Sequence, residues 1–311
     1  MLKDRLIFGS LLIAVVVGLL WADTQVAHRA AAGQLPWLSR VGLARCDGLL
    51  IAIVVAAVVV LGTREMHHLF VAAGHQPVPI WPAPVNVALV LIPFMAANAS
   101  PAAAAIRDSV DFASTVTWLT VTFLGTAFLV ARRGRISGSL GDIAATLLIV
   151  FYLGLLPQYI IRMRLVHPDG GAWLLLYFLA TVKFCDIGAF FVGRSLGRHK
   201  LIEWLSPHKT IEGLCGGVVA SAAVAVILPM AVRGWVPTSA VATLLPRPGT
   251  AVVFGVLMAL VGQGGDLFES LIKREAHAKD SANAIPAFGG VLDVLDSPLL
   301  AAPIGYWMLL P

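Results

Sequence analysis

Length, composition and charge exclude most soluble classes of protein for this chain. Of its 311 residues, 59% are hydrophobic and only 13% are charged, whereas soluble domains are about a quarter charged. That composition excludes a disordered chain and argues against a soluble nucleic-acid-binding protein, although the formal net charge is +5. Basic loops on one side of a membrane explain this excess of Lys and Arg better than a nucleic-acid-binding patch does.

Apolar runs of membrane-spanning length recur along the chain. A helix crosses the hydrocarbon of a bilayer with roughly 20 residues. The runs lie at 6–22, 47–62, 85–98, 114–131, 142–161, 172–192, 214–232, 250–268 and 298–310. They predict an all-α polytopic membrane protein with about nine transmembrane helices. We expect the first run to be a retained helix rather than a signal peptide, because no small-x-small cleavage site directly follows Trp21.

The distribution of Lys and Arg predicts the orientation. Basic residues gather in the segments 132–140, 193–213 and 269–297 and at the N-terminus. With nine crossings these segments all fall on one side, so we expect the N-terminus inside and the C-terminus outside. We divide the chain into structural N-terminal helices, residues 1–135, and a catalytic transmembrane region, residues 136–311.

Cysteine and histidine do not form a recognisable metal motif. Cys46, Cys185 and Cys215 lack zinc-ligand or disulfide spacing, and we expect all three to be small buried residues. The histidines show no ligand spacing beyond the His67-His68 doublet. Neither residue type predicts a metal site.

Charged residues concentrate in two windows of the C-terminal half, 183–212 and 262–297. In the second window Asp266, Glu269, Ser270, Lys273 and Arg274 recur at the spacing of one helix face. Acids at one level suit a divalent cation, and bases one turn further suit phosphate oxygens. The spacing predicts a metal–phosphate site at the membrane boundary, and salt bridges on a solvated helix end stay open as the alternative.

A second acidic pair, Asp293 and Asp296, follows Gly289-Gly290. The glycine pair permits a tight turn and a close approach of backbone N–H groups to an anion. A return loop here would bring Asp293 against Asp266. Alternatively, the segment 296–298 caps the last helix with Pro298 at its first position, which explains Asp296 but not Asp293.

The first window predicts a weaker phosphate site. Lys183 and Asp186 have the spacing of an ion pair within one helix. Lys209 and Thr210 offer a cation and a hydroxyl beside the glycine-rich stretch 213–217, which suits a nucleoside triphosphate. The spacing of a Walker loop is absent.

At these residues the sequence resembles the phosphatidate cytidylyltransferase (CDP-diacylglycerol synthase) family. The resemblance covers roughly residues 180–300 and keeps the spacing of two long family motifs. The residues that carry it are Asp186, Gly193, Ser206-Pro207, Lys209-Thr210, Glu212-Gly213, Gly216-Gly217, Ser270, Lys273-Arg274, Lys279-Asp280, Pro286, Gly289-Gly290, Asp293 and Asp296. Two positions depart from the pattern: Phe288 replaces the family's usual His, and Val294 replaces its usual Arg.

The resemblance implies the reaction of CTP with phosphatidate to give CDP-diacylglycerol and pyrophosphate, with Mg²⁺ as cofactor. It implies Asp266 and Asp293 as metal ligands and Asp296 as a further ligand or a neighbour of the ligands. The expected phosphate-binding residues are Lys209, Lys273, Arg274 and Lys279. The residues expected to orient these groups or the substrates are Asp186, Ser206, Thr210, Glu212, Glu269, Ser270, Asp280, Gly289 and Gly290.

Partners and location follow from the same resemblance. We expect CTP, phosphatidate and the bilayer as partners, no nucleic acid, and the active site on the cytosolic face of a bacterial inner membrane; a homodimer stays open. Two other functions remain: a CTP-dependent transferase or kinase acting on a polyprenyl or phytyl lipid, and an ion-coupled transporter. Charges that cluster near one face and in one half disfavour the transporter, which more often shows charges at mid-depth in both halves and inverted repeats.

Overall fold

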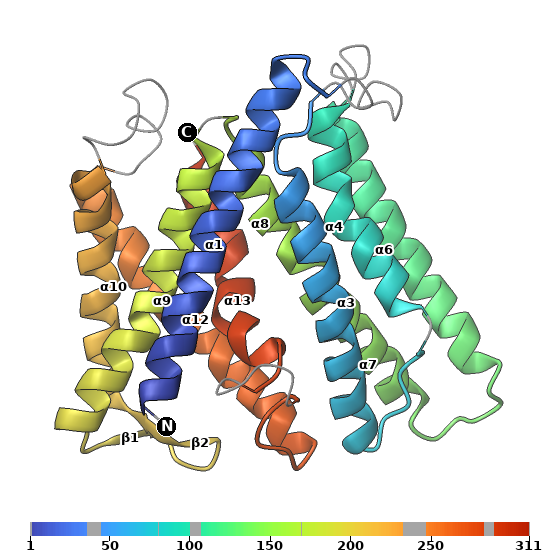
Figure 1. Cartoon of the computed structure of the whole chain (residues 1–311). Helices are drawn as coiled ribbons and strands as arrows, with labels where there is room; N and C mark the ends of the chain where they lie inside the picture. The colour runs from blue at the N-terminus through green and yellow to red at the C-terminus, as the bar shows by residue number, and fades with distance from the viewer. Residues whose placement is uncertain are drawn as a thin grey trace.

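The computed structural model describes residues 2–35, 45–79, 81–99, 107–168, 170–232, 247–282 and 289–310. Each apolar run of the sequence lies on a helix, and the helices run side by side between two ends of the molecule (Figure 1). They are α1 (Leu2–Ala31), α3 (Leu49–Ala72), α4 (Pro82–Asn98), α6 (Arg107–Ala131), α7 (Ser139–Val150), α8 (Leu156–Leu165), α9 (Gly171–Leu196), α10 (Ile211–Val232), α12 (Pro248–Glu275) and α13 (Leu292–Leu309).

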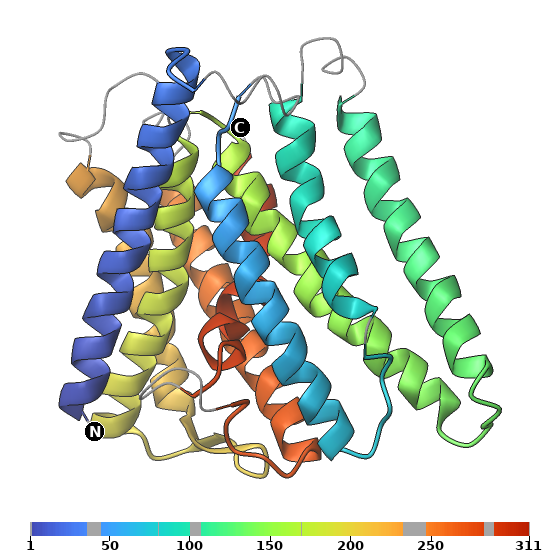
Figure 2. The same cartoon turned by 45° about the vertical axis from the view of Figure 1, so that its right-hand side comes forward.

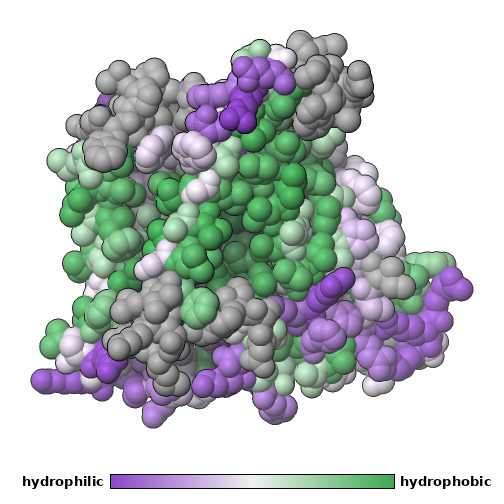
Figure 3. All heavy atoms as spheres, in the orientation of Figure 1, coloured by the Kyte–Doolittle hydropathy of each residue, from purple (hydrophilic) through white to green (hydrophobic). Residues whose placement is uncertain are grey.

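The composition of these helices is that of an all-α polytopic membrane protein. Seven helical segments of the described residues are long and apolar enough to cross a membrane, counting α7 to α8 as one. The helix α4, with 17 residues and Pro93 inside it, is a shorter apolar helix, and α13 is not among the seven. A band of apolar residues crosses the middle of the face drawn in Figure 3, with hydrophilic residues at both ends. Nine crossings and their orientation therefore stay predictions.

Two short strands lie within the basic segment 193–213, between the helices α9 and α10. Strands β1 (Lys200–Ile202) and β2 (Ser206–Thr210) pair antiparallel, with Lys200 opposite Thr210. The hairpin joins α9 to α10. It lies at the same end of the molecule as the N-terminus and the turn after α12 (Figure 2), so it brings the first charged window beside the second.

Small residues allow the C-terminal helices to pack closely. A Cβ atom added at Gly255 of α12 would lie 2.5 Å from Ala222 of α10. The single hydroxyl donor of Ser221 on α10 lies within hydrogen-bond distance of the carbonyls of both Thr181 and Gly255, which joins three helices. Such contacts are typical of membrane helix interfaces, where small residues replace bulky ones.

The expectation of three buried cysteines holds for only two of them. Cys46 and Cys185 are buried, but Cys215 is exposed on α10. Cys215 lies two residues after Gly213, on the face of α10 that the neighbouring helices do not cover. A hydrophobic position in a membrane helix can face lipid as well as protein, so apolar surroundings in the sequence did not distinguish the two.

A π-helical segment, η1 (Phe151–Leu155), interrupts the long helix formed by α7 and α8. Such insertions shift the register of the side chains that follow. Here Tyr152 is buried, and its hydroxyl donates a hydrogen bond to the carbonyl of Asp296, 3.3 Å away. The segment therefore supports the helix α13 close to its acidic residues.

Candidate active site

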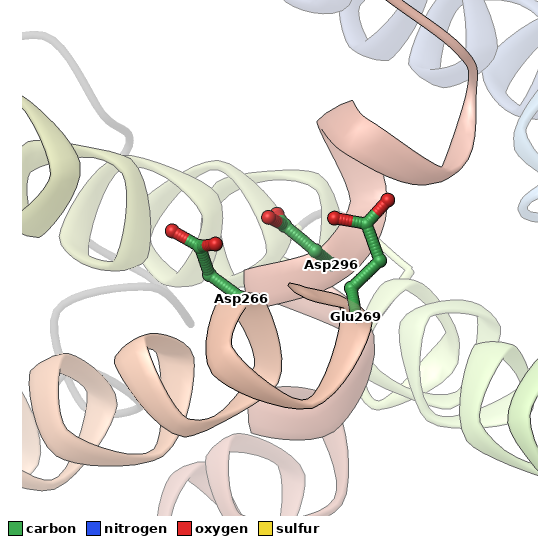
Figure 4. Close-up of side chains that lie close together, drawn as sticks. All are labelled: Asp266, Glu269 and Asp296. Atoms are coloured by element: carbon green, nitrogen blue, oxygen red, sulfur yellow. The ribbon is translucent and has the colours of Figure 1, made fainter. Parts of the chain in front are cut away.

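Three carboxylates meet where α12 packs against α13. Asp266 and Glu269 project from α12, and Asp296 projects from α13 toward them (Figure 4). One carboxylate oxygen of each lies within 4.8 Å of the others. The helices approach this closely because residue 265 is glycine: a Cβ atom there would lie 2.4 Å from the Asp296 carbonyl oxygen.

Lysines from three elements surround the carboxylates. Lys209 on β2 pairs with Asp266, with 2.7 Å between Nζ and Oδ2. Lys183 on α9 pairs with Asp186 at 3.1 Å, as its spacing predicted, and also lies 3.7 Å from Asp296. The hairpin and α9 thus converge on the carboxylate cluster of α12 and α13.

Lys273 links the cluster to the second acidic segment. Its Nζ donates to Glu269 at 2.8 Å and to Asp293 at 2.6 Å. The alternative interpretation, salt bridges along one helix end, predicts the i,i+4 pair of Lys273 with Glu269. The other two ion pairs join separate elements: Lys273 reaches Asp293 on α13, and Lys209 on β2 reaches Asp266 on α12. A surface salt-bridge ladder alone therefore does not describe this helix end.

Charge and burial at the cluster suit a cation. Counted as ionised groups, the five carboxylates of Asp186, Asp266, Glu269, Asp293 and Asp296 face three lysine ammonium groups. The Glu269 side chain is only 2% exposed, and its Oε1 has no hydrogen-bond partner among the described residues. Buried carboxylate oxygens without donors are costly unless a cation binds them, so the donor set fits a divalent metal ion.

Asp293 has different contacts from those the return-loop hypothesis predicted. Its Oδ2 accepts hydrogen bonds from the N–H groups of Ser281 and Gly290 and from the Ser281 hydroxyl. Burial raises the pKa of Asp293, but hydrogen bonds from Lys273, Gly290 and Ser281 outweigh it and hold that pKa below its usual value. The glycine turn was predicted to bring N–H groups to an anion, and that anion is the Asp293 carboxylate. The acid that lies beside Asp266 is Asp296 rather than Asp293.

The last helix does not begin at Asp296, so the helix-cap interpretation of the segment 296–298 is wrong. The helix α13 begins at Leu292, Asp293 lies in its first turn, and Pro298 lies inside it. Asp296 is a buried side chain of the helix interior, although its Oδ1 also accepts the Ser297 N–H at 2.6 Å. Its position facing α12 is therefore set by helix packing.

The remaining predicted phosphate-binding residues lie at the rim of the cluster. Arg274 is exposed and donates to the carbonyls of Leu205 and Ala278, so it braces the hairpin against the end of α12. Lys279 and Asp280 are exposed in the turn that follows α12. Their positions leave them available to a substrate that reaches the site from water.

Residues of the first window hold the hairpin in place. The Thr210 hydroxyl accepts the Gly213 N–H at the start of α10. Glu212 accepts the N–H groups of Arg198 and His199 and pairs with the His199 ring. Ser206 is half-buried on β2 opposite Ile202. These contacts position Lys209. Direct contact of Ser206, Thr210 or Glu212 with a substrate stays a prediction.

Several predicted site residues have further contacts or lie outside the described chain. The Ser270 hydroxyl donates to Asp266 over 3.4 Å. Gly289 adopts a φ of +101°, as the predicted tight turn requires. Val294 is half-buried on α13. Pro286 and Phe288 lie outside the described residues.

Sequence reasoning missed two residues of this region. Lys183 was assigned only to the pair with Asp186, because its reach to Asp296 depends on how α9 packs. Glu65 was missed because the second apolar run was taken to end at residue 62, whereas α3 continues to Ala72. The signal was available: Glu65 is the one acidic residue of α3, and an acid within a membrane helix indicates a functional site.

The fold and the site together define a class: a polytopic membrane protein with a carboxylate and lysine site suited to metal–phosphate chemistry. The chain belongs to the cytidylyltransferase family, whose model matches residues 29–310. That match includes every residue of the site described above.

Similar curated proteins are named phosphatidate cytidylyltransferases. The protein of Chlamydia pneumoniae is 28% identical over 80% of this chain and 79% of its own length. That of Bacillus subtilis (strain 168) is 36% identical over 52% of this chain and 56% of its own length. That of Synechocystis sp. is 36% identical over 56% of this chain and 65% of its own length.

Proposed function

We propose that this chain transfers the cytidylyl group of CTP to phosphatidate and produces CDP-diacylglycerol and pyrophosphate. A phosphate oxygen of the lipid forms a bond to the α-phosphorus of CTP, and the bond between the α- and β-phosphates breaks. The observation that carries the proposal is the cluster of Asp266, Glu269 and Asp296 ringed by lysines in a member of the cytidylyltransferase family. Such a step requires charge neutralisation and in-line positioning rather than a covalent intermediate.

The carboxylate cluster is the proposed Mg²⁺ site. Carboxylate oxygens are the protein ligands that Mg²⁺ prefers, and Asp266, Glu269 and Asp296 present them together. Asp293, the second ligand expected from the sequence, is not part of this group, and its Oδ2 is held by Ser281 and Gly290. When bound, Mg²⁺ neutralises charge on the triphosphate at the reacting phosphorus.

The basic residues are the proposed binding groups for the phosphates of both substrates. Lys209 and Lys273 lie inside the cluster, and Arg274 and Lys279 lie at its rim. The lipid phosphate is already ionised at neutral pH, so the attack needs no strong general base. The roles proposed for Asp186, Ser206, Thr210, Glu212, Ser270 and Asp280 are to orient the lysines and the nucleotide.

We place the site at the cytosolic boundary of a bacterial inner membrane, with nine helices crossing and the N-terminus inside. The hairpin and the end of α12 lie at the N-terminal end of the molecule (Figures 1 and 2). Soluble CTP would reach this end from the cytosol, and phosphatidate would enter from the bilayer. The division into a structural part, residues 1–135, and a catalytic part, residues 136–311, and a homodimer are further proposals.

A panel of substrates tests the function. Purified protein with Mg²⁺ is incubated with each of CTP, ATP and GTP, and with phosphatidate, polyprenyl phosphate or a free polyprenol as acceptor. The proposal predicts a cytidylylated lipid only in the reaction that contains both CTP and phosphatidate. A product formed only from a polyprenyl acceptor would instead support the alternative lipid transferase or kinase.

A further inference from the structure

The buried carboxylate of Glu65 lies in the N-terminal helices, to which the reaction assigns no part. Glu65 is 7% exposed and lies within the membrane-spanning helix α3, about two turns before its last residue, Ala72. Its partners are more than 200 residues away in the sequence, in the segment that carries Asp293. A carboxylate buried at this depth is retained only where donors compensate its loss of water.

Glu65 binds the backbone at the start of α13. Its Oε1 accepts the Val291 N–H at 2.9 Å, and its Oε2 accepts the Leu292 N–H at 3.0 Å. Val291 is the N-cap and Leu292 the first residue of the helix, so their N–H groups have no acceptor within it. A carboxylate there also interacts favourably with the positive end of the helix dipole. Glu65 thus supplies the cap that α13 itself lacks.

Glu65 also joins the two ends of the loop between α12 and α13. The Ser281 hydroxyl lies 3.1 Å from Glu65 Oε2 and 2.7 Å from Asp293 Oδ2. A Cβ atom at Gly290 would lie 2.6 Å from Glu65 Oε2 and 2.0 Å from the Ser281 hydroxyl. Any side chain at position 290 would therefore collide with Glu65 and Ser281, so this contact requires glycine there whether or not a substrate also does.

We propose that Glu65 is a positioning residue of the active site: it fixes the first turn of α13, and thereby the placement of Asp293 and Asp296, from the N-terminal half of the chain. It touches neither a reacting atom nor the metal-binding cluster. Its effect on turnover rests on the proposed function, whereas its effect on the start of α13 does not.

The test compares Glu65→Gln with Glu65→Ala and with a matched control. Asp142→Asn also changes a buried carboxylate that accepts a backbone N–H, from Gln76 at 2.7 Å, but its ion-pair partners Arg133 and Arg135 lie outside the site. Hydrogen exchange of the peptide covering residues 289–296 is measured for each protein in nanodiscs. Glu65→Gln should speed that exchange by at least about tenfold, the effect of losing one charged hydrogen bond, and Asp142→Asn should leave it unchanged.

Turnover gives the second readout. Glu65→Gln should lower kcat by roughly 10–100-fold, with a smaller change for Asp142→Asn at an equal loss of thermal stability. Unchanged exchange in residues 289–296 for both Glu65 variants would overturn the proposal whether or not the protein is active. A wild type that forms no product would instead overturn the proposed function and leave the exchange result standing.

Discussion

At the scale of single residues, the account depends on which acids hold the metal. Asp266 and Asp296 lie on facing helices, and Asp293 lies one turn before Asp296 with its oxygens bound to Lys273, Ser281 and Gly290. Substituting an amide keeps the shape of each side chain and removes its charge. The three positions therefore separate ligands from residues that position the loop.

Asp266→Asn and Asp296→Asn should each lower turnover by at least about 100-fold, because each weakens a ligand of the proposed Mg²⁺, which would neutralise charge at the reacting phosphate. Measurement of kcat over a series of Mg²⁺ concentrations checks this, with Asp47→Asn at a remote position as the control. Near-normal turnover of Asp296→Asn, combined with inactivity of Asp293→Asn, would restore the original pair of ligands, Asp266 and Asp293.

Lys273 should contribute to stability as well as to binding. Its side chain is 12% exposed and pairs with two carboxylates whose side chains are 2% and 9% exposed. Lys273→Gln should destabilise the protein by about 3–5 kcal/mol, the usual cost of removing one partner of a buried ion pair. Urea unfolding in detergent measures this.

Lys279 provides the comparison for Lys273, because it is an exposed lysine of the same segment. Lys279→Gln should change the free energy of unfolding by no more than about 0.5 kcal/mol. Equal destabilisation by both variants would contradict the buried network. A raised KM for CTP in Lys279→Gln would support its role in phosphate binding.

Most of the site residues could be predicted from the sequence, but their pairing could not. Asp266, Glu269 and Lys273 share one helix face, which their spacing determines. The choice between Asp293 and Asp296 depends on where α13 begins, and that start is capped by Glu65, 227 residues before Leu292. A contact of that sequence separation leaves no local pattern to read.

At the scale of helices, the close approach of α12 and α13 makes a prediction about two adjacent glycines. A Cβ atom at Gly265 would lie 2.4 Å from the Asp296 carbonyl, whereas one at Gly264 would lie 4.0 Å from its nearest neighbour, Leu300. Gly265→Ala should therefore destabilise the protein by about 1–3 kcal/mol through overpacking and should lower turnover by displacing Asp296.

Gly264→Ala is the matched control for Gly265→Ala. It should be neutral or stabilise the helix by up to about 1 kcal/mol, because alanine loses less backbone entropy than glycine. Thermal unfolding and kcat of both variants are compared. Equal tolerance of the two substitutions would contradict the described helix contact.

Helix positions could be predicted better than helix ends. The apolar runs identify the helices because every bilayer-spanning helix must be apolar. Charged residues continue several helices beyond the apolar run: α3 extends to Ala72, α12 extends to Glu275, and α13 starts at Leu292. The β-hairpin was not predicted because strands of three and five residues depend on pairing with each other rather than on a pattern of their own.

At the scale of the whole molecule, the proposed orientation places the hairpin in the cytosol. Cys215 is exposed, so labelling requires a Cys215→Ser background. In that background His208→Cys, in the hairpin, should react with an impermeant thiol reagent only in inverted membrane vesicles. Gln34→Cys, which follows α1 at the opposite end, should react only in right-side-out vesicles. The reverse pattern would place the site outside.

The fate of each CTP phosphate tests the central claim most directly. Protein, Mg²⁺ and phosphatidate are incubated with CTP labelled at the α-phosphate or, separately, at the γ-phosphate. The account predicts that the α label enters the lipid fraction, that the γ label leaves as pyrophosphate, and that Asp266→Asn abolishes both. The γ label in the lipid would show a kinase, and label in neither product would contradict the proposed reaction.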